Sequence, residues 1–151
     1  ILMLLQKESD AVKEENSIGS KPLHIACSYR PPFEVVTDLL QAWPDSVKEK
    51  NMFGDTPLHR ACMNRAPVEI VAALLQIWPG GVKEKNRRGN TPLHRACNYR
   101  AQFEVINLLL NTWLRYKENR TNGAIISLQS QTNTFYCTDD VKVLFSHLFA
   151  L

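Results

Sequence analysis

The stretch Thr-Pro-Leu-His-Arg-Ala-Cys occupies residues 56–62, and it recurs without a change at residues 91–97. The related stretch Lys-Pro-Leu-His-Ile-Ala-Cys lies at residues 21–27, so that the histidines at 24, 59 and 94 follow one another at a step of 35 residues. The tryptophans at 43, 78 and 113 and the glycines at 19, 54 and 89 keep the same step. A fixed period of roughly 20 to 50 residues is typical of repeat architectures, so this repeat decides the fold.

Each repeat has the pattern of two helices followed by an extended loop. In the second repeat, Pro57 lies where the first turn of a helix needs no backbone N–H, and Thr56 precedes it as an N-cap. Pro67 opens a second helix, and Pro79 ends it. An Asn-x-x-Gly turn comes next at residues 86–89, where asparagine suits an Asx turn and glycine allows a positive φ. One such unit cannot bury its apolar face alone, so the units must stack.

These blocks resemble the ankyrin repeat, whose Thr-Pro-Leu-His-x-Ala signature stands at residues 56–61 and 91–96. The resemblance covers residues 1–114 and implies an all-α fold, an ankyrin-type α-solenoid of stacked helix-turn-helix units joined by extended finger loops. The period of 35 residues exceeds the usual 33 of the family. Arginines at 30, 65 and 100 replace the family's turn glycine, which indicates a variant of the repeat.

The expected segments are a truncated repeat (second helix and finger) at 1–20, ankyrin-like repeats at 21–55, 56–90 and 91–123, and a degenerate repeat or capping helix at 124–151. Because the first segment begins inside a second helix, we expect a fragment of a longer array. Residues 127–134 are rich in Ser, Gln, Thr and Asn and predict poor helix formation. A helix is expected from Thr138, with the apolar stripe Val141, Leu144, Phe145, Leu148 and Phe149. A divergent or mis-spliced tail is the alternative.

Composition limits the function classes. The 151 residues carry a net charge of only +3, which does not by itself indicate a nucleic-acid-binding protein. No apolar run reaches the roughly 18 residues of a membrane span, and no signal peptide is recognisable. Four cysteines then indicate reduced thiols in a cytoplasmic or nuclear protein, which we expect to be monomeric.

The repeated histidines and cysteines are the residue types most typical of a metal site or a catalytic site. His59 and Cys62 stand three residues apart on one helix, a spacing that suits two metal ligands, but further ligands do not converge on them. The resemblance instead implies a histidine that hydrogen-bonds within the turn and to neighbouring backbone, and a cysteine at a small buried position. No phosphate loop, paired acid–base carboxylates or nucleophile elbow occurs. We therefore expect no catalytic residue, no metal and no cofactor, and a protein that is not an enzyme.

Two further columns are expected to be structural. The tryptophans should form core between stacked units, and the arginines at 30, 65 and 100 should cap free carbonyls at the end of each first helix. Stacking of arginine guanidiniums on the tryptophan faces is left open.

Function should lie in the columns that vary. The resemblance implies that partners contact the finger tips and the exposed face of each first helix, and the matching positions are Ile18, Tyr29, Met52, Phe53, Asp55, Arg60, Met63, Asn64, Arg87, Arg88, Asn90, Arg95, Asn98 and Tyr99. Exposed aromatic, Met and Arg residues are enriched at interfaces. We expect a scaffold or adaptor that binds a protein or extended peptide, with an apolar anchor near Phe53 and acidic residues near Arg87 and Arg88.

Four alternatives remain open. The segment could target or regulate a larger enzyme such as a kinase, ubiquitin ligase or acyltransferase. The basic third repeat could touch nucleic acid, although we disfavour this, and it would give a steep salt dependence. The repeats could act only as a spacer, or the varying positions could be unconstrained surface.

Overall fold

The computed structural model describes residues 10–131 and 139–149, and over these ranges the chain consists of helices and connecting loops. The elements are α2 (Pro22–Ser28), α3 (Phe33–Ala42), η1 (Pro44–Lys48), α4 (Pro57–Met63), α5 (Val68–Ile77), η2 (Pro79–Lys83), α6 (Pro92–Asn98), α7 (Phe103–Leu114), η3 (Lys117–Arg120), α8 (Asn122–Gln131) and α9 (Asp139–Phe149), with η marking a 3-10 helix. None of the described helices is both long and apolar enough to cross a lipid bilayer.

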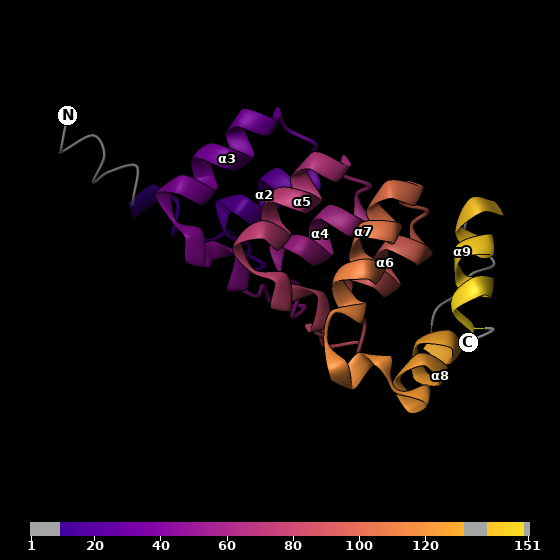
Figure 1. Cartoon of the computed structure of the whole chain (residues 1–151). Helices are drawn as coiled ribbons and strands as arrows, with labels where there is room; N and C mark the ends of the chain where they lie inside the picture. The colour runs from indigo at the N-terminus through magenta and orange to yellow at the C-terminus, as the bar shows by residue number, and fades with distance from the viewer. Residues whose placement is uncertain (1–9, 132–138, 150–151) are drawn as a thin grey trace.

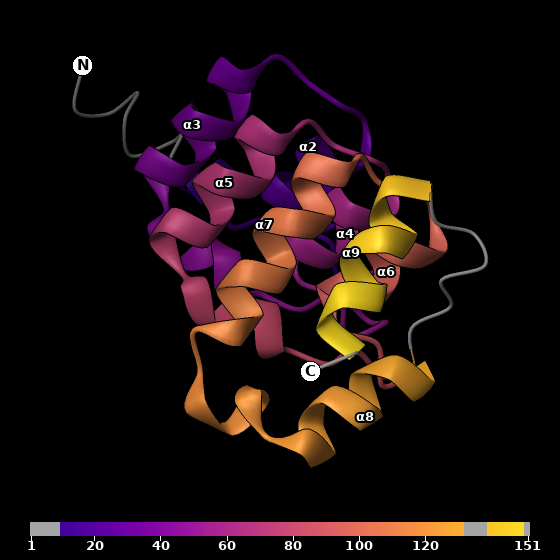
Figure 2. The ribbon, with the colours of Figure 1, turned by 45° about the vertical axis from the view of Figure 1, so that its right-hand side comes forward.

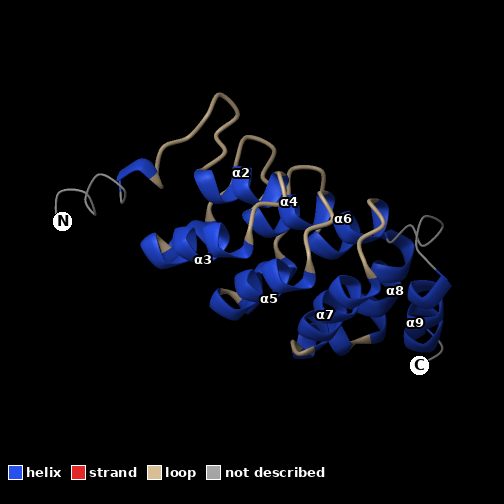
Figure 3. Ribbon diagram, turned by 90° about the horizontal axis from the view of Figure 1, so that it is seen from above, coloured by secondary structure: helices blue, strands red, loops and turns tan. Residues whose placement is uncertain are grey.

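The helices form two layers. The short first helices α2, α4 and α6 stand side by side in one layer, the second helices α3, α5 and α7 form the other, and the loops project from one edge (Figures 1 and 3). The core lies between and within these layers and includes Leu23, Cys27, Val36, Leu58, Cys62, Val71, Leu93, Cys97, Val105 and Leu109. The predicted all-α solenoid of stacked helix pairs is confirmed.

The first helices begin as the sequence predicts. The Thr56 hydroxyl accepts a hydrogen bond from the His59 backbone N–H at 3.4 Å, and Pro57 occupies the first turn of α4. Thr91, Pro92 and His94 repeat this arrangement at α6. The predicted N-cap and N-terminal proline are therefore confirmed in both repeats.

The second helices end differently in successive repeats. Pro79 comes directly after Trp78, where the chain leaves α5 with a φ of −141°. The 3-10 helix η2, which the sequence pattern did not predict, begins at this proline. In the third repeat Leu114 stands at the proline position, so the backbone hydrogen bonds continue and α7 extends through it.

This difference decides how the tryptophans pack. Trp113 lies inside α7 and is 8% exposed, which confirms a core role for this residue. Trp43 and Trp78 are only half-buried because each lies beyond the end of its helix. The cations over these two rings are lysines of the preceding repeat, Lys13 and Lys48, each 5.9 Å from the ring centre. For these two rings the stacked cations are therefore lysines, whereas the sequence left stacking by arginines open.

The repeated arginines lie in the turn between the two helices of each repeat. Arg30, Arg65 and Arg100 have φ values of 50°, 54° and 56°, in the left-handed region where glycine is usual. Arg30 Nε donates to the Asn64 carbonyl at 3.1 Å, at the C-terminal end of α4. The predicted capping of a free carbonyl is confirmed at Arg30, and the carbonyl belongs to the neighbouring repeat.

Three finger loops, at residues 16–20, 51–55 and 86–90, stand in register. The Met52 N–H donates to the Ile18 carbonyl at 2.9 Å, and the Arg87 N–H donates to the Phe53 carbonyl at 3.0 Å. Within the second finger, the Asn51 side-chain oxygen accepts from the N–H groups of Phe53 and Asp55, which confirms the expected Asx turn. Backbone bonds thus fix the distance from one finger tip to the next.

The turn glycine gives a matched pair of substitutions. Gly54 and Gly89 both have positive φ, at 73° and 80°. A Cβ on Gly54 would lie 2.9 Å from the Arg87 backbone nitrogen, whereas a Cβ on Gly89 would meet nothing within 4 Å. We expect Gly89→Ala to cost about 1 kcal/mol of unfolding free energy through backbone strain, and Gly54→Ala about 2 kcal/mol more because the fingers must separate. Urea unfolding measures both, and equal losses would show that the register of the fingers adds no stability.

The chain beyond the third repeat corrects one prediction. Residues 122–131 form helix α8, although the polar composition of 127–134 predicts poor helix formation; residues 132–134 lie outside the described residues. Thr121 caps α8 by accepting the Ala124 N–H at 3.2 Å, and Leu128 is buried in the core. This packing outweighs weak propensity.

The last helix agrees with its prediction. Helix α9 begins at Asp139, within one residue of the expected start, and packs beside α7 and against α8 (Figure 2). Of its expected stripe, Val141, Phe145 and Leu148 are buried and Leu144 packs against the core. The side chain of Phe149 lies outside the described residues.

Candidate functional site

The histidine column holds the repeats together. His59 is fully buried; its Nδ1 accepts the Thr56 backbone N–H at 3.1 Å. An accepting Nδ1 leaves the proton on Nε2, which then donates to the Asn90 carbonyl of the next finger at 2.9 Å. His24 makes the same bridge to the Asp55 carbonyl at 3.0 Å. The bonds to the turn and to neighbouring backbone that the family resemblance implies are confirmed.

The third histidine lacks half of this bridge. His94 Nδ1 accepts the Thr91 N–H at 3.0 Å, but its buried Nε2 has no hydrogen-bond partner among the described residues. His24 and His59 each bond the carbonyl 31 residues further along the chain. The carbonyl 31 residues after His94 belongs to Ile125, which is part of α8 rather than of a finger. The scaffold contact therefore changes at the point where the regular repeats end.

The cysteine column is also structural. Cys27, Cys62 and Cys97 are buried. Burial raises the pKa of the Cys27 thiol to about 12 and also raises the pKa of the Cys62 thiol, so neither forms the reactive thiolate near neutral pH. In the described ranges no group of three or more His, Cys, Asp and Glu side chains could hold a metal ion.

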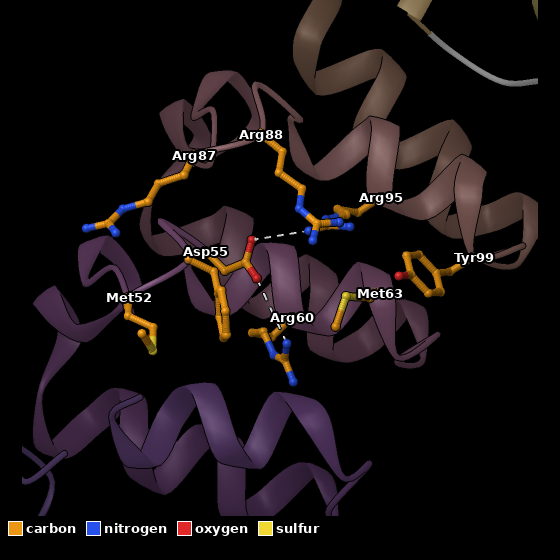
Figure 4. Close-up of a pocket in the computed structure, with 9 residues that line it drawn as sticks. Met52, Asp55, Arg60, Met63, Arg87, Arg88, Arg95 and Tyr99 are labelled. Carbon is orange, nitrogen blue, oxygen red and sulfur yellow. Dashed lines mark ion pairs between the residues drawn. The ribbon is translucent and has the colours of Figure 1, made fainter. Parts of the chain in front are cut away.

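The varying positions gather in one place. A cavity of about 400 Å³ lies between the second and third repeats. We call it the arginine pocket; it is lined by Met52, Phe53, Asp55, Arg60, Met63, Arg87, Arg88, Arg95 and Tyr99 (Figure 4). These side chains come from the second and third fingers, from α4 and α6, and from Tyr99 at the C-terminal cap of α6. Each belongs to the predicted partner-binding set.

Asp55 lies at the base of the pocket rather than at the surface. The residue is only 2% exposed, and its Oδ1 accepts a hydrogen bond from Asn86 Nδ2 at 2.9 Å. Arg60 NH1 and Arg95 NH2 approach the two carboxylate oxygens, each at 3.9 Å (Figure 4). Asp55 therefore acts as the counter-ion of the pocket. Asn86, which donates to Asp55, was missing from the predicted set. The signal in the sequence was the asparagine that recurs at positions 51 and 86, because Asn51 donates to Ser20 in the same way.

Two arginines are placed differently around this carboxylate. Arg60 is also held by Ser28, whose hydroxyl accepts from its Nε at 3.0 Å. Arg95 is 8% exposed, and its buried Nε has no hydrogen-bond partner among the described residues. Arg95 also lies over the ring of Tyr99, with its Cζ 5.9 Å from the ring centre. Arg88 extends towards this group, whereas Arg87 points away from Asp55 (Figure 4).

The rim of the pocket is apolar. Met52, Phe53 and Tyr99 are all exposed, and Phe53 exposes 47% of its surface at the tip of the second finger. Exposed large apolar residues at one place mark interaction sites more often than single ones do. The arrangement can therefore hold an extended chain that carries both an apolar and an anionic group.

The remaining predicted residues lie elsewhere. Tyr29 and Asn64 line a shallow depression that shares Met63 and Tyr99 with the arginine pocket. Ile18 and Asn90 are half-buried. The Ile18 carbonyl accepts the Met52 N–H, and the Asn90 carbonyl accepts from His59 Nε2. Asn98 is exposed and lines neither cavity.

Sequence reasoning missed an apolar groove on the layer of second helices. The groove encloses about 380 Å³, and its lining includes Phe33, Leu40, Pro44, Ala73 and Ile77. Phe33 and Ile77 are apolar yet exposed. Apolar residues at exposed positions of the second helices were therefore the signal for this groove.

Comparison with known proteins identifies the repeats. The family described as "Ankyrin repeats (3 copies)" matches residues 23–122. A search of curated proteins finds no match.

Proposed function

Since the chain belongs to the ankyrin repeat family, we propose that it is a scaffold or adaptor module whose second and third repeats hold an extended segment of another protein. The family's repeats are generally protein-binding modules. The proposed contact surface is the arginine pocket together with the adjoining depression around Tyr29 and Asn64.

One observation carries this proposal. Columns that vary along the three repeats supply the lining of the arginine pocket, and these include the column of Ile25, Arg60 and Arg95, which changes only in the first repeat. The constant histidine and cysteine columns are buried in the scaffold. Interface cores favour aromatic, Met and Arg side chains, and the lining contains all three types.

The pocket also gives the partner segment a direction. Phe53 and Met52 offer an apolar seat at the tip of the second finger, and Arg87 and Arg88 offer cations on the third. A segment that crosses from one finger to the next would place an apolar side chain on Phe53 and acidic side chains near the two arginines. Buried contact at Phe53 would supply affinity, and the charges would select the partner.

The test is a double charge reversal. Random twelve-residue peptides displayed on phage are selected on the chain at low salt, and the best binders are measured by isothermal titration. We expect Arg87→Glu/Arg88→Glu to weaken these peptides at least tenfold, since two attractive charges become repulsive. The matched control is Arg115→Glu/Arg120→Glu, which makes the same charge change at exposed positions outside the pocket and should leave affinity unchanged.

Two outcomes would contradict the proposal. An unchanged affinity in the Arg87→Glu/Arg88→Glu variant at low salt would remove the pocket from the binding surface. Failure to select any peptide would favour a spacer role.

A further inference from the structure

The arginine pocket carries more positive charge than it neutralises. Arg60, Arg87, Arg88 and Arg95 line it, and Asp55 is the acidic residue among its lining side chains. Ion pairs between described residues outside the pocket each join one lysine to one carboxylate, as Lys50 does with Glu84 at 2.8 Å. Four guanidiniums against one carboxylate leave an excess of positive charge at the surface of the pocket.

Part of this excess positive charge, the guanidinium of Arg95, is nearly buried within the pocket. The Arg95 Nε has no hydrogen-bond partner among the described residues, and the distance from the guanidinium to Asp55 is 3.9 Å. The distance joins NH2 of Arg95 to Oδ1 of Asp55 and is too long for a hydrogen bond, so Asp55 compensates the charge, while the Nε donor has no partner. A nearly buried cation with an unsatisfied donor is costly, and an anionic ligand with several acceptor oxygens would lower that cost.

The residue type of these cations narrows the ligand. The chain contains both lysine and arginine, yet the cations that line this pocket are arginines. Arginine presents a planar fork of donors that matches phosphate and carboxylate oxygens two at a time. A phosphate monoester carries about −1.5 to −2 charges and three acceptor oxygens, so it can face Arg60, Arg88 and Arg95 together. A carboxylate has one charge and two oxygens, so it would leave part of the excess positive charge without a counter-ion.

We propose that the arginine pocket recognises a phosphorylated serine or threonine side chain in the partner segment, with an apolar side chain beside it on Phe53. This inference rests on the proposed function and names the chemistry that the same pocket selects. Arg95 and Arg88 hold the phosphate, Arg60 adds a third donor group, and Asp55 orients Arg60 and Arg95. Arg87, which points away from Asp55 (Figure 4), contributes only through its charge.

The experiment uses three degenerate ten-residue peptide libraries that differ at one central position: phosphoserine, glutamate or serine. Affinities for the whole chain are measured by fluorescence anisotropy at fixed salt. We expect the phosphoserine library to bind about tenfold more tightly than the glutamate library, and the serine library to bind most weakly.

Point variants locate the site. Arg88→Gln and Arg95→Gln should each lose about tenfold in affinity for the phosphoserine library, and Arg87→Gln, the matched control, about twofold. Arg95 is buried, so a thermal melt accompanies each variant; if Arg95→Gln does not fold, the exposed Arg88 carries the test.

The contrary outcomes separate the two proposals. Equal binding of the three libraries, or equal losses from Arg87→Gln and Arg88→Gln, overturns phosphate recognition and leaves a peptide-binding module. Absence of binding to every library overturns both. A single-stranded twelve-nucleotide DNA that binds as tightly as the phosphoserine library assigns the charge to backbone phosphates and also overturns the inference.

Discussion

Replacement of His59 by alanine is expected to lower the free energy of unfolding by about 4 kcal/mol. The ring joins the Thr56 N–H of its own turn to the Asn90 carbonyl of the next finger, at 3.1 and 2.9 Å. Truncation leaves the buried Thr56 N–H without its partner, at a cost of about 1 to 3 kcal/mol, and it also opens a cavity. The Asn90 carbonyl loses the bond from His59, worth about 1 kcal/mol, but keeps the bond from the Asn86 N–H at 2.9 Å. Because the lost bond crosses between repeats, the coupling of neighbouring units weakens together with the local turn.

His94→Ala is the matched control for this prediction. His94 makes the bond to its own turn but has no partner at Nε2 among the described residues, so its truncation should cost about 1 kcal/mol less. Urea unfolding followed by far-ultraviolet circular dichroism measures both variants. Equal losses would mean that the bridge to the next finger contributes nothing.

Acidification from pH 7 to pH 4 is expected to destabilise the fold by several kcal/mol. Burial lowers the pKa of His94 to about 4, with Lys85 and His59 adding to the effect, and burial also lowers the pKa of His24 and His59. The unfolded chain has histidine pKa values near 6.5, so between pH 6.5 and 4 it binds more protons than the folded chain. Stability is therefore complete above pH 6.5 and is lost as the pH falls.

The size of this loss can be bounded for one residue. A change in pKa from 6.5 to about 4 corresponds to roughly 3 kcal/mol for His94 alone, and the other two histidines act in the same direction. Urea midpoints measured from pH 7.5 to 4 give the profile. His94→Ala should be less stable at pH 7 but should show a flatter profile below pH 6.5. A wild-type profile that is flat between pH 6.5 and 5 would contradict the prediction.

The regular part of the fold could be predicted because each feature depends on nearby residues. Thr56, Pro57 and His59 define the start of a helix within four positions, and Asn86 with Gly89 defines a turn in the same way. The 3-10 helix after Pro79 was missed because a proline marks where an α-helix ends but does not determine the conformation of the residues after it. Helix α8 was missed because its stability comes from packing of Leu128 against distant residues.

The candidate site could be predicted only as a set of positions. The resemblance pointed to finger tips and first helices, and the arginine pocket gathers much of that set. The burial of single positions could not be foreseen: of the corresponding finger positions, Ser20 and Asp55 are buried and each accepts from the asparagine of the next finger, whereas Asn90 is half-buried. The open donor on Arg95 likewise depends on distances between α6 and the second finger, which no pattern of residue types contains.

The columns that vary along the array should bind the partner, and the constant columns should support the scaffold. Amide chemical-shift mapping can locate the binding surface when ¹⁵N-labelled chain is titrated with the tightest peptide from the phosphoserine library. We expect the largest shifts at Phe53, Met63, Arg88, Arg95 and Tyr99. Largest shifts instead at Phe33, Leu40 and Ile77, on the layer of second helices, would contradict it.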